Sequence, residues 1–258
     1  MAAIENKDHV LRAIQSNTRY DGRKVDEYRK VSIEYGVSWT AEGSAKVSIG
    51  DTVIIAGVKL AAGEPYADNP DEGTLMVEAA LLPLASPMFE AGPPGIDSIE
   101  LSRVIDRGVR ESHSIDTHAL CIKKGEKVWT VTCDICTVNA DGNLFDAASL
   151  ATMAALKNAV FPDFDDDGNI DYKKKTKKSL PLTECPIAIT VWKVGDLLCV
   201  DPTQIEENVF EARLTITTIE DGSIVAMQKG GEGTLTVDDV TRMIDLAVAK
   251  AVELRKHL

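Results

Sequence analysis

Long apolar segments are absent from this chain of 258 residues. Its first ten residues are mixed and charged, without the apolar run of a signal peptide. No later stretch approaches the roughly 18 apolar residues that a membrane-spanning helix needs. We therefore expect a cytoplasmic protein that does not interact with a membrane. With 44% hydrophobic residues, the chain is able to bury a substantial core.

Cysteine is scarce, and its number is odd. The five residues lie mostly in apolar, strand-like runs, at Cys121, Cys133, Cys136, Cys185 and Cys199. This set is typical of free thiols in a reducing compartment and forms no disulfide framework. Cys133 and Cys136 have the spacing of half a zinc site, but residues three apart on a strand point to opposite faces. No second Cys or His pair follows at ligand spacing, so we expect neither a metal nor a cofactor.

Common catalytic and ligand-binding motifs are also missing. The chain has no G-x-S-x-G nucleophile turn, and no Lys-Ser or Lys-Thr follows the glycines at 230, 231 and 233. The acidic run from Asp163 to Asp171 imitates the first nine positions of a calcium-binding loop. Lys174 then stands where the bidentate glutamate is required. We interpret this run as a polar surface hairpin or loop.

Positive charge is in deficit, with 28 Lys and Arg against 41 Asp and Glu and a formal net charge of -13. This balance argues against a free-standing nucleic-acid binder, which usually has net basic charge. The lysines between Lys173 and Lys178 are most simply a solvated face, and nonspecific attraction of RNA is the less favoured alternative.

One predicted helix carries positive charge on one side only. Between Asp97 and Ser112 the helical period separates two faces. The apolar face holds Leu101, Val104, Ile105 and Gly108. The opposite face holds three residues within about 60° of each other, here called the arginine stripe: Arg103, Arg107 and Arg110. Asp97 is expected to cap the helix, with Glu100 completing a capping box.

The arginine stripe has two interpretations. Cations gathered on one face of an acidic protein indicate an anionic partner. However, three pairs have the spacing of intrahelical ion pairs, namely Glu100 with Arg103, Asp106 with Arg110, and Arg107 with Glu111. Judged from the helix alone, an ordinary solvated face is the favoured interpretation.

Strands followed by helices occur twice along the chain. The first set has strands at 31–37, 45–49, 53–60, 77–84 and 127–138, with helices at 97–112 and 147–160, the latter capped by Asp146. After a polar loop at 161–181, the second set has strands at 187–194, 197–200, 211–218 and 224–228 and a helix capped by Thr236. The pattern predicts an α+β fold of two similar βα halves, with mixed or antiparallel sheets packed against helices. We expect an N-terminal helix, around 4–14, and extension at 1–30, a first domain at 31–182 and a second at 183–258.

The chain resembles the RNase PH family in five segments: R-Y-D-G-R at 19–23, E-G-S-A-K-V-S-I-G-D-T at 42–52, E-L-S-R-V-I-D-R-G-V-R-E-S at 100–112, A-D-G-N-L-F-D-A-A-S-L at 140–150 and A-M-Q-K-G-G-E-G-T-L-T at 226–236. They span almost the whole chain. Within the family, G-E-P-Y at 63–66 and P-L-A-S-P at 83–87 make the chain most similar to the non-catalytic RNase PH-like subunits of archaeal exosomes.

This resemblance implies an RNase PH-like fold and a set of partners. It implies an alternating hexameric ring of three catalytic and three non-catalytic subunits, which binds RNA-binding cap proteins and degrades RNA from its 3′ end with phosphate. Catalytic members hold phosphate with a G-T-R-T type segment. The matching positions here are Asn143, Leu144, Phe145 and Asp146, so Phe145 replaces the arginine and Asp146 a threonine.

We therefore expect that no residue of this chain is catalytic and that the chain is inactive by itself. Phe145 offers no hydrogen-bond donor, and a carboxylate at Asp146 would repel phosphate by about 1 to 4 kcal/mol. Glu184 falls near the position of the family's general acid, but a structural or surface role is favoured because the phosphate site is missing. The alternative is a self-sufficient phosphorolytic exoribonuclease or nucleotidyltransferase in which another basic residue replaces the arginine.

The resemblance also changes the interpretation of the arginine stripe. Arg103 and Arg107 match residues through which non-catalytic subunits contact the RNA backbone, and Arg110 is a weaker third candidate. Such contacts position a strand without reading its sequence. A subunit that only spaces the ring, with no RNA contact, is a further alternative.

Overall fold

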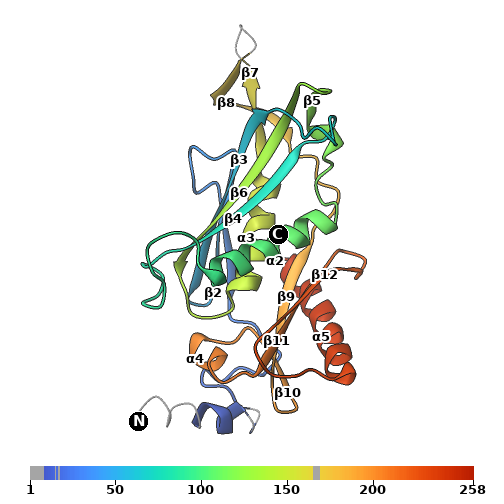
Figure 1. Ribbon diagram of the computed structural model, residues 1–258. Helices are drawn as coiled ribbons and strands as arrows, with labels where there is room; N and C mark the ends of the chain where they lie inside the picture. The colour runs from blue at the N-terminus through green and yellow to red at the C-terminus, as the bar shows by residue number, and fades with distance from the viewer. Residues whose placement is uncertain (1–8, 15, 17, 165–168) are drawn as a thin grey trace.

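Two sheets enclose one central helix in the computed structural model, which describes residues 9–14, 16, 18–164 and 169–258 (Figure 1). That helix, α3 (Leu144–Asn158), is buried on all sides, since every residue from Asp146 to Leu156 is buried. Many of these residues are alanines, which let both sheets approach the helix closely. A helix that is apolar all round belongs in the middle of a core.

The first sheet has the order β1-β2-β3-β6-β4, with β5 also paired to β6. Its strands are β1 (Val31–Tyr35), β2 (Gly43–Ile49), β3 (Thr52–Gly63), β4 (Thr74–Leu81), β5 (Cys121–Lys123) and β6 (Lys127–Asn139), and the 3-10 turn η1 (His118–Leu120) precedes β5. Gly50, with φ +56°, allows the tight turn expected between β2 and β3. The other pairs are antiparallel, but β4 and β6 are parallel because the chain crosses over through α2 (Ile96–Glu111).

The second sheet is antiparallel, in the order β10-β9-β11-β12. It contains β9 (Ile187–Val194), β10 (Leu197–Val200), β11 (Ala212–Thr218) and β12 (Ile224–Gly230) and is joined by the short helix α4 (Gln204–Glu207) and by α5 (Val237–Arg255). Thr236 caps α5 through Asp239, as the sequence predicts. Val237, the first residue of α5, is 85% exposed.

Other expectations about helix ends were wrong. α2 begins at Ile96 with Gly95 as its N-cap residue and has no side-chain cap, so Asp97 is not the cap. Asp97 lies in the first turn, where its carboxylate interacts favourably with the helix dipole. α3 begins at Leu144 with Asn143 as N-cap residue in the left-handed conformation, so Asp146 is not the cap. Asparagine adopts that conformation more readily than most residues.

The expected polar loop at 161–181 contains a hairpin of β7 (Val160–Phe164) and β8 (Ile170–Ser179). β8 carries the lysine run, whose five side chains are exposed. Of the residues that imitate a calcium loop, Asp165, Asp167 and Gly168 lie outside the described residues. In the described ranges, no group of three or more His, Cys, Asp or Glu could hold a metal ion. No helix in these ranges is long and apolar enough to cross a membrane.

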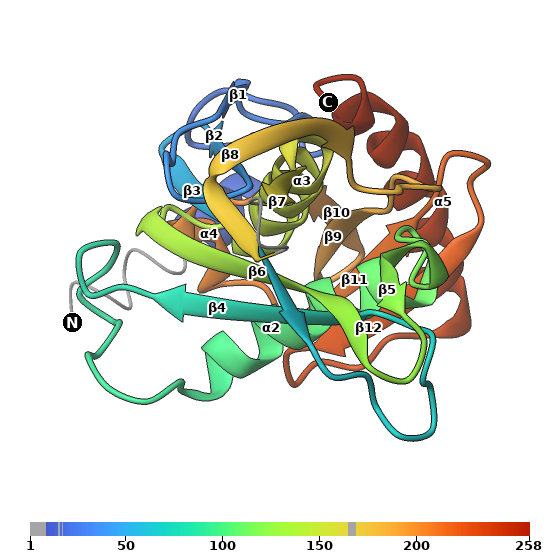
Figure 2. The same cartoon turned by 90° about the horizontal axis from the view of Figure 1, so that it is seen from above.

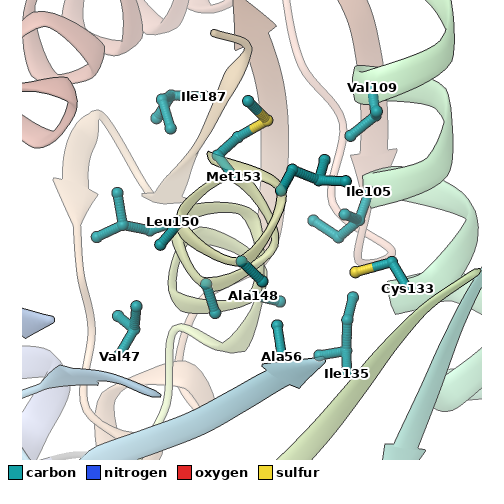
Figure 3. Close-up of a cluster of buried hydrophobic side chains, with 14 of the residues drawn as sticks. Val47, Ala56, Ile105, Val109, Cys133, Ile135, Ala148, Leu150, Met153 and Ile187 are labelled. Atoms are coloured by element: carbon teal, nitrogen blue, oxygen red, sulfur yellow. The ribbon is translucent and has the colours of Figure 1, made fainter. Parts of the chain in front are cut away.

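The core joins both sheets around α3 (Figure 3). Val47, Ala56 and Ile135 of the first sheet and Ile187 of the second are fully or almost fully buried against it. Residues 9–14 form a helix, and Val10 and Ile14 pack with Val194 of the second half. The part of the predicted N-terminal helix before residue 9 lies outside the described residues.

Candidate nucleic-acid interface

α2 is held in one orientation between β4 and β12 (Figure 2). Its buried residues are Ser98, Leu101, Val104, Ile105, Gly108 and Val109, which include the whole predicted apolar face. A Cβ at Gly108 would lie 3.0 Å from Cγ2 of Thr217, so glycine permits the close approach of α2 to β11. Because this face is fixed by packing, the arginine stripe is turned outward.

Arg103 and Arg107 are free cations on the exposed face. Within the described part of the chain, neither side chain forms a hydrogen bond or an ion pair. Two of the three expected intrahelical pairs are therefore not formed. Glu100 instead binds Arg213 of β11, with 2.8 Å between Oε2 and Nη2. Two of the three ion pairs on which the interpretation as an ordinary solvated face relied are therefore absent among the described residues.

Arg110 is tied to its surroundings. Its Nη2 lies 2.6 Å from Oδ1 of Asp106, as expected, and 2.9 Å from the carbonyl oxygen of Leu75. The hydrogen bond with Asp106 raises the pKa of Arg110. Arg110 therefore contributes less free positive charge than Arg103 or Arg107.

The N-terminus of α3, where the resemblance placed a lost phosphate site, is filled by the chain itself. Oε1 of Glu207 accepts a hydrogen bond from the Asn143 amide at 2.8 Å. The guanidinium of Arg213 lies over the Phe145 ring, 4.3 Å from its centroid. Helix N-termini attract anions, and here an internal carboxylate takes that position. Burial raises the pKa of Glu207 to about 7.

Asp146 was expected to face and repel a phosphate, and this expectation was wrong. Its carboxyl group is fully buried, accepting hydrogen bonds from the Tyr28 hydroxyl and, at 2.7 Å, from the Thr190 amide. Burial raises the pKa of Asp146 to about 7. Asp146 therefore connects α3 to β9 within the core.

Most arginines near α3 are neutralised by buried carboxylates. Asp201, with φ +47° and no exposed surface, binds Arg29 at 2.7 Å, Arg23 at 2.8 Å and the Asn143 side chain at 2.9 Å. Arg19 forms a buried pair with Glu206. Below, the α3 cluster means Arg23, Arg29, Asn143, Phe145, Asp201, Glu207 and Arg213. The arginines of R-Y-D-G-R are thus structural, which the spacing along the sequence does not reveal.

Glu184 is not near Phe145. The Thr190 amide binds Asp146 in the first turn of α3, and the Ala188 amide binds Ser149 in the next turn. Moving back along β9 towards Glu184 therefore leads away from the N-terminus of α3. Glu184 shares a hydrogen bond with Glu220, which raises the pKa of Glu184.

The resulting surface on α2 presents two unpaired cations to solvent among the described residues. Arg103 and Arg107 are one helical turn apart, about 6 Å along the axis, and both present free guanidinium groups. Such groups bind phosphate oxygens through paired, charge-assisted hydrogen bonds. The sequence pattern identified these two residues, but it missed Arg213 and Glu207 because their partners are distant along the chain.

Comparisons with known proteins identify the family of the chain. The family model RNase PH, described as 3′ exoribonuclease family, matches with domain 1 at residues 27–162 and domain 2 at 184–250. Curated proteins named exosome complex component Rrp42 are similar throughout. The one from Methanocella arvoryzae is 46% identical over 98% of this chain and 95% of its own length, and the one from Archaeoglobus fulgidus is 46% identical over 97% and 94%.

Two solved structures have the same fold. A chain of the Archaeoglobus fulgidus exosome with RNA bound to the active site superposes with a TM-score of 0.92, at 45% identity over 99% of this chain and 98% of that one. A chain of an archaeal exosome core gives a TM-score of 0.88, at 40% identity over 99% and 96%. The two βα halves thus form an RNase PH-like fold.

Proposed function

The chain belongs to the RNase PH family of 3′ exoribonucleases, and we propose that it is the non-catalytic, RNA-positioning subunit of an archaeal-type exosome. Relatives at 43 to 46% identity are named as the exosome component Rrp42 over nearly their full length. One structural neighbour is an exosome with RNA in its active site. In this function, the assembly degrades RNA from the 3′ end by phosphorolysis, and this chain shapes the active site of its partner.

The single observation that carries the lack of activity is the filled N-terminus of α3. Phosphorolysis needs inorganic phosphate held as a nucleophile beside a second anion, the scissile phosphodiester. In this chain the Asn143 amide already donates a hydrogen bond to Glu207, and Phe145 lies at the position where catalytic members have arginine. The Asn143 amide is thus not free to donate to a phosphate, and Glu207 in its charged form would repel a phosphate beside it by about 1 to 4 kcal/mol. The phosphate is therefore bound by the partner subunit.

Arg103 and Arg107 supply the RNA contact. They are exposed and unpaired among the described residues, whereas the protein as a whole carries a net charge of -13. This balance keeps the isolated chain a weak RNA binder, and the partner provides the remaining cations. Three copies of this chain alternate with three catalytic subunits in the ring, and RNA-binding cap proteins sit on it.

Mixing the chain with its partner tests this function. The purified chain, a catalytic RNase PH-like subunit and their reconstituted complex are each incubated with RNA and phosphate, and nucleoside diphosphate release is measured. We expect no release from the chain alone and more from the complex than from the partner alone. Release by the lone chain would contradict the proposal.

A second candidate function is a self-sufficient phosphorolytic exoribonuclease, and Arg213 is the observation that favours it. Arg213 lies over Phe145, and its Nη1 is buried without a hydrogen-bond partner among the described residues. However, Glu100 binds Nη2, and Glu207 also lies close enough for electrostatic interaction with Arg213. The cation is thus already compensated, so we favour the first function. In the same assay, phosphorolysis by the lone chain that Arg213→Gln abolishes would establish the second.

A further inference from the structure

The positive charge of β8 is largely uncompensated. The strand contains five lysines and one aspartate, and all five lysine side chains are exposed. Of these lysines only Lys174 forms an ion pair within the described residues, with Asp171 at 3.7 Å. Asp171 lies opposite Asp163, where β7 ends and β8 begins, so the two aspartates are gathered at that end of the hairpin. The lysines without an ion pair are Lys173, Lys175, Lys177 and Lys178.

β8 is tied to the loop between β1 and β2, residues 36–42. Figure 2 shows β8 passing across the end of the first sheet, beside β2 and β3. The Lys175 ammonium group donates to the Ala41 carbonyl at 2.6 Å. Lys59 of β3 donates to the Thr40 carbonyl at 2.7 Å and lies over the Tyr172 ring, 5.2 Å from its centroid. Segments far apart along the chain therefore form one continuous surface.

Trp39 projects from this loop and is 97% exposed. The backbone that carries it is held in place, because the Ser38 amide donates to the Ser44 hydroxyl at 2.9 Å and the Ala41 amide donates to the Ser38 hydroxyl at 3.3 Å. No aromatic ring or cation of the described residues packs against the indole. Both faces of the ring are thus available, and little ordering of the loop is needed for binding.

We propose that a second RNA contact, here called the hairpin surface, is formed by Trp39, Tyr172 and the four lysines of β8 without an ion pair. The proposal rests on the proposed function, in which the partner holds the 3′ end of the RNA. The arginine stripe on α2 lies near the middle of the molecule, whereas β8 lies at one end (Figure 1). The hairpin surface therefore meets nucleotides nearer the 5′ end, and only in an RNA long enough to reach it.

The chemistry of the hairpin surface suits a single strand. Proteins that hold single-stranded nucleic acid without sequence preference combine cations, which follow the phosphates, with aromatic rings on which bases stack. Lys59 covers one face of Tyr172, so Trp39 is the main stacking group. The ammonium groups bind phosphates as point charges, and such contacts do not read the sequence.

The surroundings of Trp39 favour RNA over a protein partner. The core of a protein interface is depleted in charged residues, and lysine is rarer there than on the rest of the surface. A tryptophan that dominates such an interface lies in a packed pocket from which water is excluded. Trp39 instead has Ser38 and Thr40 as chain neighbours, and the nearby hairpin contributes lysines. An exposed ring beside free cations matches a polyanion that carries bases.

The test measures the affinity of the reconstituted complex for single-stranded RNAs of increasing length. Fluorescence anisotropy is used without phosphate, so that no RNA is consumed. For long RNAs we expect Trp39→Ala to lower affinity about 5- to 150-fold, the equivalent of ~1 to 3 kcal/mol for one stacked base. Trp39→Phe should keep most of the affinity, and Tyr20→Ala, which removes another exposed ring, should change nothing. For RNAs too short to reach β8, Trp39→Ala should have no effect.

Charge reversal on β8 gives an independent measurement. Lys173→Glu with Lys177→Glu should weaken the binding of long RNAs and lower the dependence of log affinity on log salt by about 0.7 for each lost contact. Lys24→Glu with Lys30→Glu reverses two exposed lysines outside the hairpin surface and is the matched control. Neither pair of substitutions should affect the binding of short RNAs.

The dependence on RNA length decides the outcome. The proposal is overturned if Trp39→Ala and Lys173→Glu with Lys177→Glu bind all RNAs normally, or weaken short and long RNAs alike. It is also overturned if these variants lose only the binding of a cap protein, measured by size-exclusion chromatography, because the surface would then bind protein. If only Arg103→Glu with Arg107→Glu weakens RNA binding, the hairpin surface fails and the proposed function stands. If no variant weakens it, the proposed RNA contact on α2 fails as well.

Discussion

Two groups of arginines differ in whether a carboxylate lies within reach. On α2, Arg103 and Arg107 face solvent without a side-chain partner among the described residues. In the α3 cluster each arginine binds a carboxylate at 2.8 Å or less: Arg23 and Arg29 bind Asp201, and Arg213 binds Glu100. The first group can attract an external anion. The positive charge of the second group is already compensated by carboxylates of the chain, so this group stabilises the fold.

Burial explains why the two groups are not interchangeable. An ion removed from water loses its hydration, and only a well-placed partner compensates for that loss. The side chain of Asp201 has no exposed surface, so it needs all of its contacts. Exposed Arg103 and Arg107 keep their hydration. The comparison predicts large effects on stability at the α3 cluster and effects on binding alone at the arginine stripe.

The largest expected effect is that of Asp201→Ala. The substitution leaves Arg23, Arg29 and Asn143 without their shared acceptor, and breaking such a buried pair costs about 3 to 5 kcal/mol. We expect the free energy of unfolding, measured by urea denaturation, to fall by this amount. Asp196→Ala, at the exposed turn between β9 and β10, is the control and should change it by less than about 0.5 kcal/mol. Equal stability of the two variants would contradict the structural role of the α3 cluster.

The next effect is a pH dependence from Asp146. Its pKa is about 7 in the folded protein against 3.8 as the ordinary value, so the folded state binds the proton more tightly than the unfolded state. Stability therefore falls as pH rises from about 4 to 7, by up to about 1.4 kcal/mol per pH unit. Asp146→Asn replaces the titrating carboxyl group by a neutral amide. The unfolding free energy of this variant should therefore rise relative to that of the unchanged protein as the pH increases over that interval. Denaturation at pH 5, 6 and 7 measures the difference, and a constant difference would exclude the effect.

The third effect concerns RNA and not stability. Arg103→Glu with Arg107→Glu should leave unfolding and ring assembly unchanged but weaken RNA binding and turnover by the complex, because the two proposed phosphate contacts are lost. Each lost contact also lowers the dependence of log affinity on log salt by about 0.7. For an RNA too short to reach β8, Lys173→Glu with Lys177→Glu is the matched control, since it reverses two exposed cations elsewhere. Unchanged degradation at low salt would contradict the role of the stripe.

The sequence predicted the arginines of α2 better than those of the α3 cluster. The exposure of the first group follows from a local pattern, whereas the partners of the second group are distant along the chain. The faces of α2 follow from a period of 3.6 residues, so the exposure of Arg103 and Arg107 was predictable. Glu100 has Arg103 three residues away but binds Arg213, 113 residues away. Its choice depends on how β11 passes α2, which no local pattern contains.

The same distinction applies to the fold. Strands such as β9 and β10 were predicted with their exact ends, since their apolar alternation and the Gly195 turn are local. The run from Asp163 to Asp171 was interpreted as a polar surface hairpin or loop, and its described ends belong to the hairpin of β7 and β8. The strands themselves were not predicted, because their lysines and aspartates have no apolar period. The parallel pairing of β4 with β6 was also missed, because it depends on the crossover through α2.

The smallest expected effect comes from removing the charge that is paired with Arg213, which makes Arg213 more similar to Arg103 and Arg107. Glu100→Gln removes the charge that compensates Arg213 but keeps an acceptor at the same place, so we expect a loss of only about 1 kcal/mol in unfolding free energy. Glu111→Gln, an exposed residue of the same helix, is the control. The Asn143 amide still donates its hydrogen bond to Glu207 in this variant. The lone Glu100→Gln chain should therefore release no nucleoside diphosphate from RNA and phosphate. Release would show that Arg213 needs only the loss of one carboxylate to act on phosphate, and the two groups would then differ by a single charge.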